Sequence, residues 1–280
     1  MDDRLKRSLP FGEWETAAFV VGDGEEPGRL PLVVLHGGPG GCHDPLEGLG
    51  ALAEQGRRVV LYDQLGSGES SRADDVELWT VETFIDQLES VRDGLGLDEL
   101  HLFGSSWGGM LALEYAFTRP AGLGSLILNS TPTSAPHWAE EALRLHADLP
   151  PGLDEKQAEE EFKRRHIIRI DPEPEVLARA RAKFGTQVYE TMWGPNEFTV
   201  TGTLKGWDVI PRLREVDVPT LITSGRYDEC TPRLVEPLHA GVAGSEWVLF
   251  EDSAHMAYLE ETERYLQVVG GFLDRVEGFA

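Results

Sequence analysis

Residues 100–109 read Leu-His-Leu-Phe-Gly-Ser-Ser-Trp-Gly-Gly, an apolar run that ends in two serines framed by glycines. The run Leu100–Phe103 predicts a buried strand, and residues 109–119 predict a helix. Between them, residues 104–108 fit the pattern G-x-S-x-G with Ser106 at its centre. Small residues two positions away on each side leave room for a serine in a strained turn. We therefore predict that Ser106 is a nucleophile, exposed above a sheet at a helix N-terminus.

A serine hydroxyl is a poor nucleophile until a base removes its proton, so the chain needs a histidine and an acid as partners. In strand-turn-helix sites of this kind, the partners follow the serine in the order acid, then histidine. Asp228 follows the apolar run 220–223, and His255 follows the last apolar run, 247–250. Asp252 is an alternative acid, although it lies on the same loop as His255 and only three residues before it. We predict a catalytic triad of the serine, Asp228 and His255.

A glycine-rich turn, His36-Gly37-Gly38-Pro39-Gly40, follows the apolar run 30–35. The backbone N–H groups of Gly38 and Trp107 are predicted to form the oxyanion hole, in which each donor is worth on the order of 3 kcal/mol of barrier. A phosphate-binding loop is the rival interpretation of this turn. It is excluded because no Lys-Ser/Thr pair follows and the pattern G-x-G-x-x-G is absent.

Continuous apolar runs separated by amphipathic segments predict the fold class, a mostly parallel sheet flanked by helices. The segment 81–95 is one such amphipathic helix, with Phe84, Leu88 and Val91 on its apolar face. Residues 132–208 are instead charged and rich in helix-forming residues. We predict a core made of residues 1–131 and 209–280, with residues 132–208 inserted as a helical cap over the carboxyl edge of the sheet, where ligands of such sheets bind.

The balance of 49 acidic against 25 basic residues gives a formal net charge of −24. This charge argues against nucleic acid or an anionic membrane as a partner and favours a small cationic ligand. The first residues lack a secretory apolar region, and no run approaches the roughly 20 apolar residues that cross a bilayer. We therefore expect a cytoplasmic protein. Cys42 and Cys230 are expected to be free thiols, and no Cys/His spacing indicates a metal site.

Several motifs together resemble one family, the proline iminopeptidases and the related tricorn-interacting aminopeptidase factors of the α/β-hydrolase superfamily. The matching stretches run from the first glycine-rich turn to the last loop: residues 36–40, 62–70, 104–109, 194–199, 225–232 and 253–256. One departure is Leu65, where many members carry arginine. The resemblance implies an α/β-hydrolase fold with a helical cap and no metal or cofactor.

The resemblance also implies a role for two further acids. Glu229, beside Asp228, and Glu197, in the cap, match the acids that hold the substrate's free α-amine in the aminopeptidases of the family. Two carboxylates around one ammonium would place the first peptide bond, and no later one, at Ser106. Without the resemblance, both would be taken as ordinary exposed or helix-capping acids.

We therefore expect a serine aminopeptidase that releases an N-terminal residue, proline or a small or apolar one. Its substrates would be short peptides or amino-acid amides with a free N-terminus. One alternative is an amino-acid amide hydrolase or small-ester hydrolase with the same triad. Another, from a different class, is a non-catalytic ligand-binding protein on a hydrolase scaffold, since fold does not fix function. No oligomeric state follows from the sequence.

Overall fold

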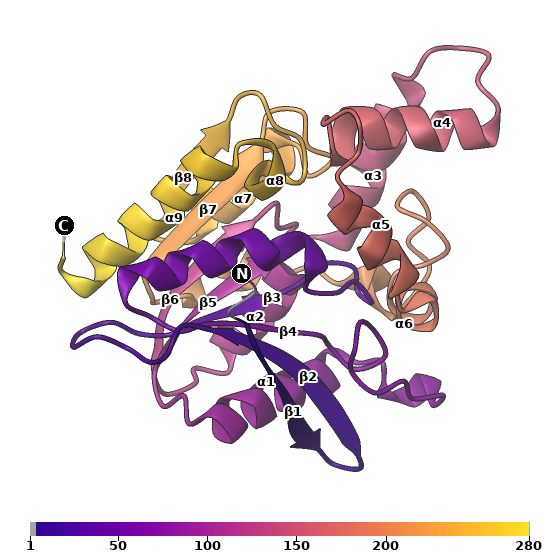
Figure 1. The fold of residues 1–280 in the computed structure, drawn as a ribbon. Helices are drawn as coiled ribbons and strands as arrows, with labels where there is room; N and C mark the ends of the chain where they lie inside the picture. The colour runs from indigo at the N-terminus through magenta and orange to yellow at the C-terminus, as the bar shows by residue number, and fades with distance from the viewer. Residues whose placement is uncertain (1–3, 280) are drawn as a thin grey trace.

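One sheet organises residues 4–279, the part of the chain that the computed structural model describes (Figure 1). Eight strands form it across these residues: β1 (Leu5–Phe11), β2 (Trp14–Val21), β3 (Leu32–Leu35), β4 (Val59–Tyr62), β5 (Leu100–Ser105), β6 (Leu123–Asn129), β7 (Thr220–Gly225) and β8 (Glu246–Phe250). Their order is β1-β2-β4-β3-β5-β6-β7-β8. Strands β3 to β8 are parallel to their neighbours, whereas β2 runs antiparallel to both β1 and β4. The predicted mostly parallel sheet is confirmed.

The central strands are apolar throughout because both faces of the sheet are covered. In β3, Val33 and Leu35 pack into one hydrophobic core, while Leu32 and Val34 pack into another on the opposite face. Side chains alternate between the faces of a strand, so a strand between two cores needs an unbroken apolar run. This is the physical reason that the sequence pattern predicted these strands.

Helices cover the two faces in separate layers. The first core takes residues from α1 (Val81–Leu95), α2 (Trp107–Phe117) and α7 (Pro232–Gly241). The second takes residues from the 3₁₀ helix Asp44–Gln55, α8 (Ala257–Glu260) and α9 (Thr262–Glu277). Short 3₁₀ turns also occur at Val76–Leu78, Thr203–Gly206 and Ile210–Glu215. Helix α1 has the predicted bounds, because the Thr80 side chain caps its first turn and Gly96 ends it with φ 63°.

The segment between β6 and β7 is helical, as its charged composition indicated. It contains α3 (Ala135–Ala147), α4 (Glu155–Phe162), a π-helical turn (Lys163–Ile167), α5 (Glu175–Ala182) and α6 (Thr186–Met192). We call residues 132–208 the cap segment. Figure 1 shows these helices gathered beside one end of the sheet, away from the C-terminal end of α9. A β-bridge between Ser134 and Asp208 joins the two ends of the segment.

The N-terminal hairpin of β1 and β2 is the part of the sheet that the sequence pattern did not predict. Strand β1 lies at the edge of the sheet, is mostly exposed, and contains Pro10. An exposed edge strand needs no apolar run, so its sequence lacks the signal of the central strands. The local signal is the turn at Gly12-Glu13, in which Gly12 has φ 60°. This turn connects β1 to β2, and the pairing of the two strands begins with Phe11 opposite Trp14.

None of the helices within residues 4–279 combines the length and the apolar composition needed to cross a lipid bilayer.

Candidate active site

The turn after β5 holds Ser106 in a strained conformation. Ser106 has φ 55° and ψ −118°, and it immediately precedes α2. A Cβ on Gly104 would lie 2.3 Å from the backbone oxygen of Gly108, and a Cβ on Gly108 would lie 2.3 Å from the oxygen of Leu35. Only glycine avoids both contacts, so the spacing of the motif follows from the close approach of strand and helix. The Ser106 N–H donates to the carbonyl of Asn129, 2.8 Å away, which fixes the turn against β6.

His255 and Asp228 meet at the same edge of the sheet. The Nδ1 of His255 lies 2.7 Å from Oδ1 of Asp228, which is 1% exposed and also accepts the N–H of Cys230 at 2.8 Å. Since a carboxylate only accepts, Nδ1 carries the proton and Nε2 is left as the basic nitrogen. Asp252, the alternative acid, is exposed on the surface. The geometry therefore pairs His255 with Asp228.

The environment of His255 favours its role as a base. Burial lowers the pKa of His255, but the charge and the hydrogen bond of Asp228 outweigh burial and raise the pKa above its ordinary value. The Ser130 hydroxyl donates to the backbone carbonyl of His255 at 3.1 Å, which holds the loop after β8 in place. An imidazole in this setting takes up a proton readily and has a carboxylate to stabilise the resulting charge.

The glycine-rich turn lies directly beside the nucleophile. A Cβ on Gly37 would be 3.4 Å from the Cβ of Ser106. Gly38, in the same turn, has φ 121°, a conformation that favours glycine. Trp107 is the first residue of α2, so its N–H is one of the four that lack a partner within the helix. The predicted oxyanion donors therefore lie on two adjacent turns that flank Ser106.

Gln64 connects these two turns. Its side-chain oxygen accepts Nε1–H of Trp107 at 2.8 Å, and its side-chain nitrogen donates to the His36 carbonyl at 3.2 Å. The Gln64 N–H donates to Nε2 of His36 at 2.9 Å, so the His36 proton lies on Nδ1 and is donated to the Gly37 carbonyl. Burial lowers the pKa of His36, which keeps this imidazole neutral. Sequence analysis did not single out Gln64, although it lies within a motif that carried the family resemblance.

Five of the predicted site residues line one cavity of about 670 Å³. They are Gly38, Ser106, Glu197, Glu229 and His255. The other two, Asp228 and Trp107, are buried beside them. The rest of the lining is largely apolar and comes from both the core and the cap segment, as in Leu46, Phe162, Leu177, Phe184 and Phe198. The cavity therefore has a polar end at the triad and the two glutamates, within apolar walls.

Glu229 is a buried acid that forms no ion pair with a Lys or Arg among residues 4–279. It is 3% exposed, its Oε2 finds no hydrogen-bond partner among residues 4–279, and its Oε1 lies 3.8 Å from Nδ1 of His255. Burial raises the pKa of Glu229 well above its usual range, and the charges of Glu197 and Asp228 add to the shift. A cation placed beside Glu229 would oppose both causes, because it favours the ionised carboxylate.

Glu197 is fixed within the cap segment by two aromatic residues. Its Oε1 accepts the hydroxyl of Tyr189 at 2.7 Å, and its backbone carbonyl accepts Nε1–H of Trp138 at 3.2 Å. Burial also raises the pKa of Glu197. Tyr189 and Trp138 carry no signal in the sequence pattern, because their contacts depend on how the cap helices pack.

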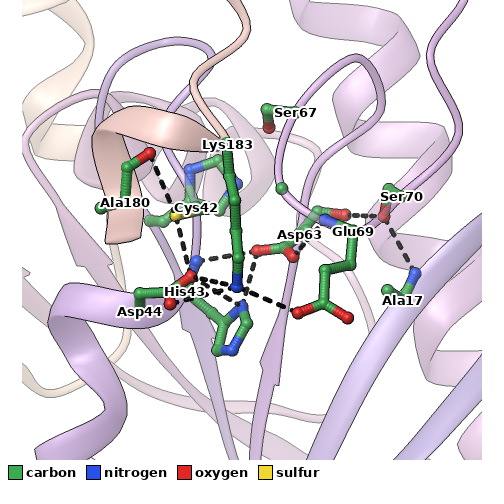
Figure 2. Close-up of polar contacts among 12 residues, drawn as sticks. Ala17, Cys42, His43, Asp44, Asp63, Ser67, Glu69, Ser70, Ala180 and Lys183 are labelled. Atoms are coloured by element: carbon green, nitrogen blue, oxygen red, sulfur yellow. Dashed lines mark hydrogen bonds and ion pairs between the residues drawn. The ribbon is translucent and has the colours of Figure 1, made fainter. Parts of the chain in front are cut away.

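Asp63 organises the loop after β4 and takes no part in the cavity lining (Figure 2). Its carboxylate accepts the backbone N–H of His43 at 2.8 Å, Nδ1–H of His43 at 2.9 Å and the N–H of Glu69 at 2.8 Å. The Ser70 hydroxyl donates to the Asp63 carbonyl at 2.6 Å and accepts the N–H of Ala17. Asp63, which belongs to the matching stretch 62–70, thus joins the loops around the site to the hairpin strand β2.

Figure 2 also shows how α5 is attached to the core. Lys183, just after α5, lies 3.0 Å from both Oδ2 of the buried Asp44 and Oε1 of Glu69. Arg179 of α5 reaches Asp44 at 3.3 Å. Cys42 donates its S–H to Asp44 at 3.1 Å. This cluster fixes one side of the cap segment next to the cavity.

The remaining predictions concern cysteines and metals. Cys42 and Cys230 are free, as predicted; both are also buried, and burial raises the pKa of both thiols. Within the described residues, no group of three or more His, Cys, Asp or Glu side chains is arranged to hold a metal ion.

Comparisons with known proteins show the family to which the chain belongs. The sequence matches the family model for the α/β hydrolase fold over residues 31–262. It is 40% identical to the proline iminopeptidase of Lactobacillus delbrueckii subsp. lactis, over 96% of this chain and 97% of that sequence. The crystal structure of the proline iminopeptidase from Mycobacterium smegmatis superposes with a TM-score of 0.92 and 38% identity, covering 98% of this chain and 99% of the other. The crystal structure of VinJ gives a TM-score of 0.92 and 39% identity, with coverage of 97% and 99%.

Proposed function

The chain belongs to the α/β-hydrolase family, among the proline iminopeptidases, and we propose that it removes an N-terminal proline, or a small or apolar residue, through an acyl-enzyme. Its substrates are short peptides or amino-acid amides with a free N-terminus. Ser106, Asp228 and His255 carry the chemistry, and Glu197 and Glu229 select the amine.

In the first half of the reaction, Oγ of Ser106 attacks the carbonyl carbon of the first residue. Nε2 of His255 takes the hydroxyl proton and passes it to the leaving amine as the C–N bond breaks. Asp228 orients the imidazole through Nδ1 and stabilises its positive charge, while the N–H groups of Gly38 and Trp107 stabilise the oxyanion.

In the second half, water replaces the leaving amine. His255 takes a proton from this water, whose oxygen attacks the ester carbonyl of the acylated Ser106. The ester bond breaks, the proton returns to Oγ, and the amino acid leaves with its carboxylate newly formed. The same imidazole therefore serves as base and acid in each half.

One observation supports the preference for a free N-terminus most strongly: Glu229 is a buried carboxylate whose Oε2 is unpaired among residues 4–279, in the cavity that Ser106 lines. A substrate ammonium between Glu229 and Glu197 would supply the missing positive charge. At about 4 Å, such a pair interacts by roughly 4 kcal/mol at an effective dielectric of about 20. The amine anchor then leaves only the first peptide bond within reach of the nucleophile.

The experiment compares kcat/KM for prolyl, alanyl and phenylalanyl p-nitroanilides, the corresponding amides, and N-acetylated forms of each. We expect acetylation to lower kcat/KM by at least about 100-fold, because it removes a charge worth several kcal/mol. Labelling of Ser106 by a fluorophosphonate is the control for a competent nucleophile. Equal turnover of free and acetylated substrates would contradict the proposal, and the amides show whether peptides or amides are preferred.

A further inference from the structure

We propose that His166, in the cap segment, is a positioning residue that holds Glu229 where it receives the substrate's amine. The inference rests on the function proposed above, because it concerns the same amine site. It assigns a role to the π-helical turn, which touches the loop after β7 from the cap side.

Helix α4 changes to a π-helical turn at Lys163–Ile167, where the N–H of Ile168 bonds to the carbonyl of Lys163 at 3.0 Å. His166 lies in this last turn, so its carbonyl is among those without a partner inside the helix. That carbonyl accepts the N–H of Glu229 at 3.1 Å. π-Helical turns of this kind are frequent at functional sites, where they redirect backbone groups.

The His166 side chain makes a second bond to the same loop. Its Nδ1 lies 2.8 Å from the carbonyl of Tyr227, and because a carbonyl only accepts, Nδ1 donates. His166 therefore bonds to the residue before Asp228 and to the residue after it. Two hydrogen bonds that bracket one residue fix the direction in which the loop presents its side chains.

Glu229 depends on this clamp more than Asp228 does. The Asp228 carboxylate has its own bonds, to the Cys230 N–H and to His255. Glu229, in contrast, has no such bond for Oε2 among residues 4–279, and its Oε1 approaches His255 only to 3.8 Å. Its position is set by its backbone, which His166 holds. Loss of the clamp should therefore impair amine selection while sparing the triad.

The stretch around His166 is itself fixed to the rest of the site. The Arg169 N–H donates to Oε1 of Glu260 at 2.5 Å, and Oε2 of Glu260 accepts the N–H of Ala254, the residue before His255, at 2.6 Å. The Arg169 guanidinium also lies 3.8 Å from the centre of the Tyr227 ring. The π-helical turn is thus held to both loops of the triad.

A chain of aromatic contacts links the turn to the other acid. The Phe162 ring lies 5.0 Å from the His166 ring and 4.7 Å from the ring of Phe198, measured between centroids. Phe198 directly follows Glu197. The same stretch of the cap segment therefore contacts the residue next to Glu197 as well as the backbone of Glu229, which is the arrangement expected if it sets the distance between the two acids.

The test uses His166→Leu, which keeps bulk but removes the donor, and His166→Asn, whose amide restores a donor near Nδ1. The surface variant His239→Leu is the matched control, because His239 is exposed on α7, its side chain bonds to Ser245, and it is not among the residues that line the cavity. Each variant is assayed on prolyl p-nitroanilide and on the amine-free ester p-nitrophenyl acetate.

We expect His166→Leu to lower the ratio of kcat/KM between the two substrates by about two- to tenfold, the range that one hydrogen bond supports. The change should appear as a higher KM for the prolyl substrate, with kcat/KM on the ester within about twofold of the wild type. His166→Asn should recover most of the ratio, and His239→Leu should not change it. If His166→Leu fails to fold, His166→Gln, whose longer amide misplaces the donor, replaces it with the same expectation.

Two results would overturn the inference. A parallel loss on both substrates would indicate general damage to the triad loop, and an unchanged ratio in His166→Leu would show that the bond to Tyr227 positions nothing. Failure of the proposed function looks different, because the wild type itself would then turn over free and acetylated prolyl substrates equally.

Discussion

At Gly108, a single added methyl group would meet the backbone of a neighbouring strand. Gly108→Ala places its Cβ 2.3 Å from the Leu35 carbonyl oxygen, and neither backbone can yield without moving β3 or α2. We expect a loss of about 2–4 kcal/mol in the free energy of unfolding, as for other overpacked core positions. Urea denaturation measures it.

The control for this substitution is Gly48→Ala in the exposed turn of the 3₁₀ helix, where nothing lies within 4 Å of the added Cβ. It should change stability by less than about 1 kcal/mol, in either direction. If the two substitutions had equal effects on stability, the close approach of strand and helix would not be the reason that residue 108 is glycine.

The site residues that could be proposed from the sequence are those whose signal is local. Ser106 is marked by glycines within its own turn, and Asp228 and His255 by their places after strands. Gln64 and Tyr189 were missed for the opposite reason, since each acts through a partner far away in sequence, at Trp107 and Glu197. Periodicity and motif spacing carry no information about such pairs.

Among the elements, prediction succeeded where burial on two faces imposes an unbroken apolar run. The strands from β3 to β7 meet this condition, whereas β8 is a half-buried edge strand. The helix α1 was predicted by its one apolar face and has clear caps at both ends. Helix α2 begins two residues earlier than predicted, because the glycines after Ser106 are already helical. The hairpin β1–β2 and the π-helical turn depend on neighbours that the sequence pattern does not reveal.

The attachment of α5 to the core can be tested through Lys183. Burial raises the pKa of Asp44, but its bonds with Lys183 and Cys42 outweigh burial and lower the pKa below its usual value. Lys183→Met leaves this buried carboxylate with the weaker Arg179 contact. We expect a loss of about 1–3 kcal/mol in the free energy of unfolding at pH 7.

The pH dependence of this loss follows from the sign of the shift. A carboxylate whose folded pKa is lowered contributes stability above its unfolded pKa of about 3.9 and loses it as the pH falls through the folded value. The difference between wild type and Lys183→Met should therefore shrink below about pH 4. Urea unfolding at several pH values checks this, with the exposed Lys205→Met as control. A loss that is independent of pH would show that Lys183 acts by packing rather than through Asp44.

For the whole molecule, the arrangement of charge is more informative than its total. The 49 acidic and 25 basic residues give the net charge of −24, but Glu197 from the cap segment and Glu229 from the core both line one cavity. In the proposed function, the core supplies the nucleophile and base, and the cap segment supplies the clamp around the acid loop. The proposed amine selection is thus a property of the assembled molecule, and this is why the sequence supported it only through family resemblance.

The most direct test of this account compares prolyl p-nitroanilide with cyclopentanecarbonyl p-nitroanilide, which has the same ring size and leaving group but no amine. For the wild type we predict that kcat/KM favours the prolyl substrate by about 10³-fold, the equivalent of a 4 kcal/mol charge pair. In Glu229→Gln the preference should fall at least tenfold, while kcat/KM on the carbocyclic substrate is unchanged or higher. Equal kcat/KM for the two substrates in the wild type would contradict the account.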